Sequence, residues 1–117
     1  MKDNLDMLNW FSRSPQSDSV VITGASTGIG AACALALDKL GYRVFAGVRL
    51  PADGERLQQQ AGPRLMPIRL DVTDTASISA ASHTVAAMVG ERGLAGLVNN
   101  AGIGVAGPIE LLPLADW

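Results

Sequence analysis

Short apolar runs alternate with longer segments of helical periodicity along this chain, and this alternation limits the possible folds more than any other feature. Apolar runs rich in Val, Ile and Leu at 19–23, 43–48, 65–70 and 94–99 predict buried strands. Helices are expected at 29–40, at 51–61, and from a cap at Thr73 or Asp74 to about Arg92. Repeated strand–helix units give parallel strands joined by right-handed crossovers. The sequence therefore predicts an α/β fold with helices on both faces of the sheet.

The helix at 29–40 carries an apolar side that we expect to face the sheet: Ile29, Cys33, Ala36, Leu37 and Leu40. Gly41 follows as the glycine that ends the helix. This placement predicts a buried, inert thiol for Cys33.

Length and composition allow one small domain. The chain has 117 residues, 48% of them hydrophobic, which is enough for one core and too little for two domains. Residues 19–117 form the predicted domain. Residues 1–18 are polar and irregular and are expected to be an N-terminal extension, in which Trp10 and Phe11 either dock on the domain or begin a short helix.

Charge and residue usage exclude several classes of partner. The net charge is -2 and no Lys/Arg block occurs, so no nucleic-acid partner is expected. No apolar run approaches the roughly 20 residues that span a bilayer, and residues 1–18 do not have the pattern of a signal peptide. The single cysteine and the single histidine, His83, argue against a disulfide and a metal site. We expect a cytoplasmic protein, with His83 as a surface or packing residue.

A glycine-rich turn between the first strand and the first helix is the strongest candidate binding feature. It reads Thr23-Gly24-Ala25-Ser26-Thr27-Gly28-Ile29-Gly30, with the spacing G-x-x-x-G-x-G. Helix N-termini present unpaired N–H groups to phosphates. Gly24 would allow the sharp turn, Gly28 the close approach of a pyrophosphate, and Gly30 the close packing of helix on strand. The alternative is a glycine-rich loop that binds no ligand.

This turn, together with two later motifs in the same order, resembles the short-chain dehydrogenase/reductase family. Asp71-Val72 follows the third strand, where the family places an acidic residue near the adenine ring, and Asn99-Asn100-Ala101-Gly102 follows the fourth, where the family stabilises the sheet and touches the adenine ribose. The stretch GPIELLPLADW is similar to the start of the family's fourth helix. The resemblance covers about Val20 to Trp117. It implies an incomplete Rossmann-type, doubly wound parallel sheet of about four strands in the order 3-2-1-4.

The resemblance also implies a set of cofactor contacts. The alternative role for Asp71 is to cap the following helix. For Asn99 and Asn100, a structural role is at least as well supported as ligand contact. The complete set of expected contacts is Thr23, Gly24, Ser26, Thr27, Gly28, Ile29, Gly30, Arg49, Asp71, Val72, Asn99, Asn100, Ala101 and Gly102.

The end of the second strand bears on the choice between NAD and NADP. An acidic residue there binds the ribose hydroxyls, whereas an arginine accepts a 2′-phosphate. NAD-preferring relatives have an Asp at the place of Val48, and here Arg49 follows an apolar residue instead. The resemblance therefore implies NADP(H) over NAD(H), with Arg49 on the 2′-phosphate; the alternative is a solvated arginine at a strand end.

No catalytic residue can be assigned. The family implies a Ser, a Tyr-x-x-x-Lys pair whose Lys lowers the Tyr pKa, and an Asn in the fourth helix; the only tyrosine, Tyr42, has Ala46 in the Lys position. A full-length form would act on a small alcohol or carbonyl compound, and members often form homo-oligomers. This chain is expected to be an inactive cofactor-binding fragment of such an enzyme. The alternatives are a non-catalytic NADP-binding module and a non-functional truncated remnant.

The fourth strand is expected to form an unpaired sheet edge. Further strands would lie beside it in a full member of the family, and an exposed apolar edge favours aggregation or pairing. We therefore expect the isolated chain to be marginally stable and to bind NADP weakly, through its adenosine half.

Overall fold

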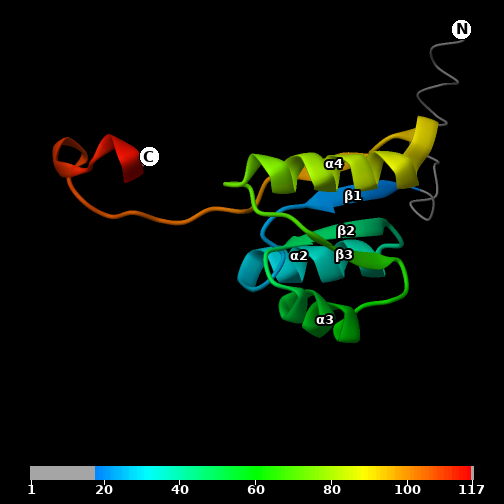
Figure 1. Cartoon of the computed structure of the whole chain (residues 1–117). Helices are drawn as coiled ribbons and strands as arrows, with labels where there is room; N and C mark the ends of the chain where they lie inside the picture. The colour runs from blue at the N-terminus through cyan, green and yellow to red at the C-terminus, as the bar shows by residue number, and fades with distance from the viewer. Residues whose placement is uncertain (1–17, 117) are drawn as a thin grey trace, which may run out of the picture.

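The computed structural model describes residues 18–116, and within this range strands and helices alternate as the sequence predicts (Figure 1). The strands are β1 (Ser19–Ile22), β2 (Arg43–Val48), β3 (Leu65–Arg69) and β4 (Gly96–Val98). The α-helices are α2 (Gly28–Lys39), α3 (Pro51–Gln60) and α4 (Thr75–Val89). Shorter 3₁₀ turns are η2 (Gly90–Arg92), η3 (Ile109–Leu111) and η4 (Leu114–Asp116).

All four strands are parallel and lie in the order β3-β2-β1-β4, which confirms the predicted order. Helices α2 and α3 cover one face of the sheet and α4 covers the other (Figure 1). Each of the first three strands is followed by a crossover helix, and the four parallel strands all end at the same edge of the sheet. Every loop that follows a strand therefore lies at that carboxyl edge.

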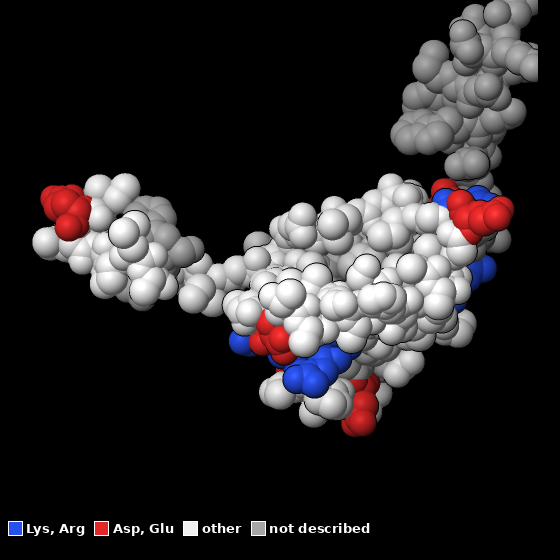
Figure 2. Space-filling model, turned by 45° about the horizontal axis from the view of Figure 1, so that its top comes forward, with Lys and Arg blue, Asp and Glu red and all other residues white. Residues whose placement is uncertain are grey.

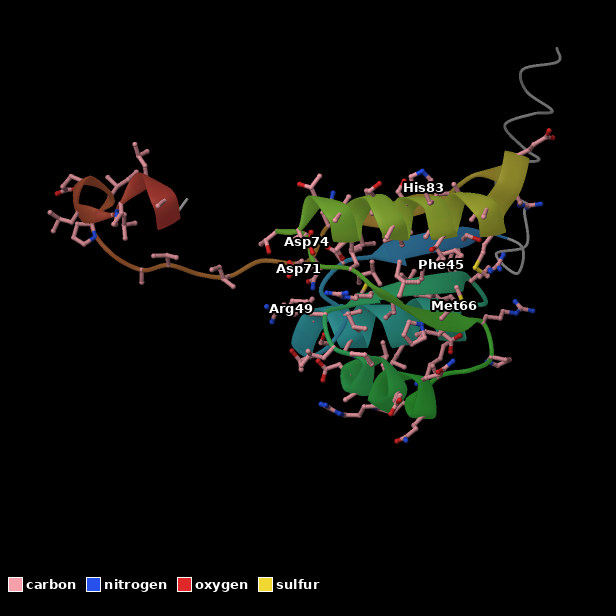
Figure 3. All side chains as sticks on the ribbon, in the orientation of Figure 1. Phe45, Arg49, Met66, Asp71, Asp74 and His83 are labelled. Atoms are coloured by element: carbon pink, nitrogen blue, oxygen red, sulfur yellow. The ribbon has the colours of Figure 1, made fainter. Side chains whose placement is uncertain are left out.

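The core forms two apolar layers because neighbouring residues of a strand point to opposite faces. Ile22, Val44 and Leu65 face α2 and α3, whereas Val21 and Phe45 face α4. Phe45 is fully buried, and Figure 3 shows it between the sheet and α4. Burial on both faces explains why the strands are continuous apolar runs rather than alternating ones.

The sheet-facing side of α2 differs from the expected one. Ile29 is 81% exposed and Leu40 64% exposed, and Ala36 is exposed as well. The buried positions are Gly30 and Ala34. The helix is turned so that these small residues are buried. At Gly30 a Cβ would collide with the Gly24 carbonyl oxygen, so a small residue is needed where the helix meets the glycine turn. Cys33 is consequently half-buried rather than buried, and Leu37 is partly buried against the core.

The ends of the domain also differ slightly from the prediction. The Asp18 carbonyl oxygen accepts a bond from the Arg43 N–H (2.9 Å), and its carboxylate pairs with Arg92 (3.0 Å). The domain thus includes Asp18, the last residue of the extension predicted at 1–18. The rest of that extension, residues 1–17 with Trp10 and Phe11, lies outside the described residues.

The fourth strand is shorter than the predicted run at 94–99. It pairs only with β1, by three residues of β4, Gly96–Val98. The chain then leaves the sheet, and Figure 1 shows residues 103–116 extending away from the layers. The segment that resembles the start of a helix forms the two 3₁₀ turns η3 and η4 instead.

Candidate functional site

The predicted site residues converge at the carboxyl edge of the sheet. The glycine turn follows β1, Arg49 follows β2, Asp71-Val72 follows β3 and Asn99–Gly102 follows β4. Figure 3 shows Arg49, Asp71 and Asp74 at this same end of the layers. Parallel strand direction alone brings these four segments, which are distant in sequence, to one edge.

The three glycines of the turn differ in the space that is available at their Cβ positions. Gly24 has φ +66°, and a Cβ there would lie 2.8 Å from the Ala101 Cα. At Gly30 a Cβ would collide with the Gly24 carbonyl oxygen, so this glycine allows α2 to pack closely. Gly28 also has a positive φ, of +58°, but nothing lies within 4 Å of the Cβ position. The space above Gly28 is therefore open to an approaching group.

The first turn of α2 offers uncommitted donors at this opening. Its N-cap residue, Thr27, makes no side-chain capping bond and is exposed. The Ala31 N–H bonds the Thr27 carbonyl oxygen at 3.3 Å, so the N–H groups before Ala31 have no intrahelical partner. Ser26 is half-buried and Ile29 exposed beside them. This arrangement is chemically suited to an anion.

A hydrogen-bonded link joins the glycine turn to the end of β4. The Thr23 hydroxyl oxygen accepts bonds from the backbone N–H groups of Asn100 and Ala101, both at 3.0 Å. The Asn100 side-chain amide donates to the Gly24 carbonyl oxygen at 3.0 Å. Asn100 therefore has a structural role, whereas the side chain of Asn99 is exposed and makes no hydrogen bond to residues 18–116.

The two aspartates that follow β3, Asp71 and Asp74, have different hydrogen-bonding roles. Asp74 caps α4, accepting bonds from the Ala76 N–H (3.0 Å) and the Ser77 N–H (3.3 Å). Asp71 does not cap the helix. One of its oxygens, Oδ1, accepts bonds from the Thr73 hydroxyl (2.7 Å) and the Thr73 N–H (2.9 Å), and the other bonds no donor within residues 18–116. This second oxygen is available to a ligand.

The Thr73 bonds set the charge state of Asp71. The pKa of the Asp71 carboxyl lies below its ordinary value. The largest cause is the hydrogen bond from the Thr73 hydroxyl, and the second is the hydrogen bond from the Thr73 N–H. Desolvation opposes this shift, and the positive charges of Arg49 and Arg69 add to it. Asp71 is therefore a carboxylate at neutral pH.

Arg49 is exposed directly after the buried Val48, so its guanidinium is accessible at the edge. Val72 and Gly102 are exposed, and Ala101 is half-buried beside Gly24. Among residues 18–116, no three potential metal ligands gather in one place. His83 lies on the outer side of α4 (Figure 3), with its Nδ1 2.8 Å from the Ser79 carbonyl oxygen. Of the two predicted roles, surface or packing, the structure shows the surface one.

Sequence reasoning missed two residues at this edge and one surface that runs from it along α4. Ser77 is buried, and its hydroxyl accepts a bond from the Asp71 N–H (2.9 Å); its place in the first turn of α4, three residues after the cap, was the available signal. Arg69 is the last residue of β3. An apolar groove of about 690 Å³ lies between α4 and β4, lined in part by Leu70, Val85 and Leu97.

The groove adjoins an uncharged face of the molecule. Helix α4 contains no Asp, Glu, Lys or Arg, and Figure 2 shows an uncharged surface between charged groups at its two ends. Among residues 18–116, no helix combines the length and the apolar character needed to cross a bilayer.

A four-stranded parallel sheet with a glycine turn at its first crossover defines a Rossmann-type α/β domain. Residues 18–117 match the family model for short chain dehydrogenases. The chain therefore belongs to the short chain dehydrogenase family.

Similar sequences and structures agree with this assignment. The chain is 44% identical over 105 residues to retinol dehydrogenase 5 of Mus musculus, covering 88% of this chain and 33% of that protein. It is 45% identical over 102 residues to 17-beta-hydroxysteroid dehydrogenase type 6 of Bos taurus, covering 83% of this chain and 32% of that protein. The chain thus spans about a third of the length of these curated relatives.

Two solved structures share the fold. A short chain dehydrogenase from Bacillus anthracis aligns with a TM-score of 0.76 and 25% identity, over 90% of this chain and 43% of that one. A 3-ketoacyl-(acyl-carrier-protein) reductase from Brucella melitensis, complexed with NADH, aligns with a TM-score of 0.75 and 30% identity, over 88% of this chain and 42% of that one.

Proposed function

We propose that this chain is the cofactor-binding part of an NADP(H)-dependent oxidoreductase that transfers hydride between a nicotinamide and an alcohol or carbonyl substrate. The observation that carries the proposal is the opening above Gly28 at the start of α2, in a chain of the short chain dehydrogenase family. A reductase of similar fold is complexed with NADH, which supports a nicotinamide dinucleotide as the cofactor.

The residues at the carboxyl edge fit a dinucleotide. The pyrophosphate would lie against the N–H groups of the first turn of α2, where the positive end of the helix dipole favours it. The free oxygen of Asp71 would accept a bond from the adenine amino group, with Val72 against the ring. The contacts proposed for the turn and for the end of β4 are Thr23, Gly24, Ser26, Thr27, Gly28, Ile29, Gly30, Asn99, Asn100, Ala101 and Gly102.

The preference for NADP(H) rests on Arg49. The buried Val48 carries no acidic group that would repel a 2′-phosphate, and Arg49 is exposed beside it with no ion pair among residues 18–116. A guanidinium binds phosphate oxygens through paired, charge-assisted hydrogen bonds. Arg49 is therefore the residue we expect to distinguish the two cofactors.

When bound, the nicotinamide would supply or accept the hydride, and the residues of this chain would bind and orient the adenosine half. We assign no catalytic residue. The only tyrosine of the sequence, Tyr42, directly precedes β2 and so lies at the amino edge, opposite the candidate site. The chain alone is therefore expected to be inactive.

We make further proposals about the whole protein on the basis of its relatives. Two of them are named for retinol and for a 17-beta-hydroxysteroid, so we expect an apolar alcohol or ketone as substrate. Assembly into homo-oligomers and a cytoplasmic location stay predictions.

Titration of NADPH and NADH into the purified 117-residue chain, followed by cofactor fluorescence, tests the proposal. We expect NADPH to bind more tightly than NADH, and Arg49→Ala to reduce the difference. Lys39→Ala is the matched control, because Lys39 is exposed in the last turn of α2, at the opposite edge. Absence of binding at millimolar cofactor, or tighter binding of NADH, would contradict the proposal.

A further inference from the structure

The arginines of the domain fall into two groups. Four of those in residues 18–116 are held by the protein: Arg43 by the Met88 carbonyl oxygen (3.1 Å), Arg56 by Asp53 (2.7 Å), Arg64 by the Gly41 carbonyl oxygen (2.8 Å) and Arg92 by Asp18 (3.0 Å). Arg49 and Arg69 make no hydrogen bond or ion pair within that range, and both are exposed. The two arginines without such a partner are the two at the carboxyl edge.

Arg49 and Arg69 belong to neighbouring strands. In the parallel register of β2 and β3, Arg69 lies opposite Val48, the residue before Arg49. Arg69 also lines a shallow hollow of about 360 Å³ together with Val48 and Leu50, the two residues that flank Arg49. The charge of each arginine acts on Asp71. Both guanidinium groups therefore belong to one local charge cluster.

The sign of this cluster depends on Arg69. Asp71 is a carboxylate, and Glu55 on α3 lines the same hollow as Arg69 without forming an ion pair with it. With Arg49 as its only cation, the cluster would carry a net negative charge and would repel a phosphate dianion. Arg69 brings the sum to zero and leaves both guanidinium groups free to donate.

We propose that Arg69 is a second specificity-determining residue, which acts with Arg49 to select the 2′-phosphate of NADP(H). This inference rests on the proposed function, because it concerns the same adenosine site. The positive charge of Arg69 attracts the 2′-phosphate. Its guanidinium is also able to donate a hydrogen bond to a phosphate oxygen.

Binding of adenosine 2′,5′-bisphosphate and adenosine 5′-monophosphate to the 117-residue chain, measured by calorimetry, tests it. These probes contain only the adenosine half, so they do not require the nicotinamide half of the site. Arg69→Gln should weaken bisphosphate binding by about three- to tenfold, the scale of one partly screened charge, and leave monophosphate binding unchanged. Arg49→Gln should do the same, the double variant should show no preference, and Lys39→Gln is the matched single-charge control.

The outcomes separate the two proposals. If Arg49→Gln removes the preference and Arg69→Gln, still folded by circular dichroism, does not, the role of Arg69 is refuted and the proposed function stands. If the unaltered chain binds neither probe, or binds both equally, the NADP(H) proposal fails and the role of Arg69 fails with it. A preference that declines as salt is raised and is reduced in both single variants supports both.

Discussion

The hydroxyl oxygen of Thr23 lies 3.0 Å from the backbone nitrogen of Asn100, a residue 77 positions later in the chain. The same oxygen accepts a second bond, from the Ala101 N–H. Thr23 follows β1 and begins the glycine turn, whereas Asn100 follows β4. The turn and the far end of the chain are thus fixed relative to each other by one buried side chain.

Thr23→Val should therefore destabilise the domain although it preserves the shape of the side chain. Two backbone N–H groups would lose their acceptor, and we expect a loss of about 1–3 kcal/mol in the free energy of unfolding. Urea denaturation measures this loss. Thr23→Ser retains the oxygen and should recover most of the stability. Equal stability of the Val variant and the unaltered chain would show that the link does not contribute to stability.

The glycines of the turn should respond differently to alanine. Gly30→Ala places a Cβ against the Gly24 carbonyl oxygen, and we expect a loss of more than about 3 kcal/mol, or failure to fold. Gly28→Ala meets no atom and has only its positive φ to overcome, at a cost of about 1–2 kcal/mol. Thermal unfolding compares the two.

Cofactor titration of the Gly28→Ala variant adds a functional measurement. The new methyl group would occupy the opening where the pyrophosphate is proposed to lie, so we expect a folded chain with markedly weakened NADPH binding. Undiminished binding would argue against this position for the pyrophosphate.

The charge of Asp71 should respond to Thr73. Thr73→Val removes the hydroxyl bond that contributes most to lowering the Asp71 pKa, so the pKa of this carboxyl should rise toward its ordinary value. Because the pKa is depressed in the folded chain, the stabilisation from Asp71 is present above the unfolded-state pKa and is lost as pH falls through the folded value.

Carboxyl-detected NMR titration measures the Asp71 pKa directly. Thr84→Val is the matched control, because the Thr84 hydroxyl bonds the Ala80 carbonyl oxygen on the exposed side of α4. An Asp71 pKa that is the same in the Thr73 and Thr84 variants would refute the assigned cause.

The exposed edge at β4 should control self-association of the 117-residue chain. Leu97 is 57% exposed on a strand that pairs only with β1, and a charged side chain on such an edge opposes pairing with another molecule. We expect Leu97→Lys to lower concentration-dependent association in sedimentation experiments without loss of helical signal. Leu40→Lys, at an exposed position after α2, should have no comparable effect.

Much of the fold could be predicted because apolar runs and turn residues act locally. The ends of β2 agree with the prediction to the residue, and Gly41, with φ +96°, follows α2 as expected. The packed side of α2 was predicted wrongly, since its large residues Ile29 and Leu40 are exposed. Periodicity indicates which side of the helix is apolar. The residues that are buried, Gly30 and Ala34, are decided by how closely the helix packs on the rest of the domain.

The candidate site shows the same division between local and distant information. The motifs place Arg49, Asp71 and Asn100 each after a strand, and their common location follows from parallel strands. The sequence left open whether Asp71 is a cap and whether Asn100 is a clamp. In the structure Asp74 is the cap, and Asn100 donates to the Gly24 carbonyl oxygen.

The sequence by itself determined the order of strands and helices, the family and the positions of the glycine turn, because these depend on residue type and spacing along the chain. Only the tertiary structure decided that Thr23 links to Asn100, that Arg69 lies opposite Val48 and that Asp71 keeps one free oxygen. These relationships depend on strand register and on competition among nearby donors and acceptors, which spacing along one chain does not specify.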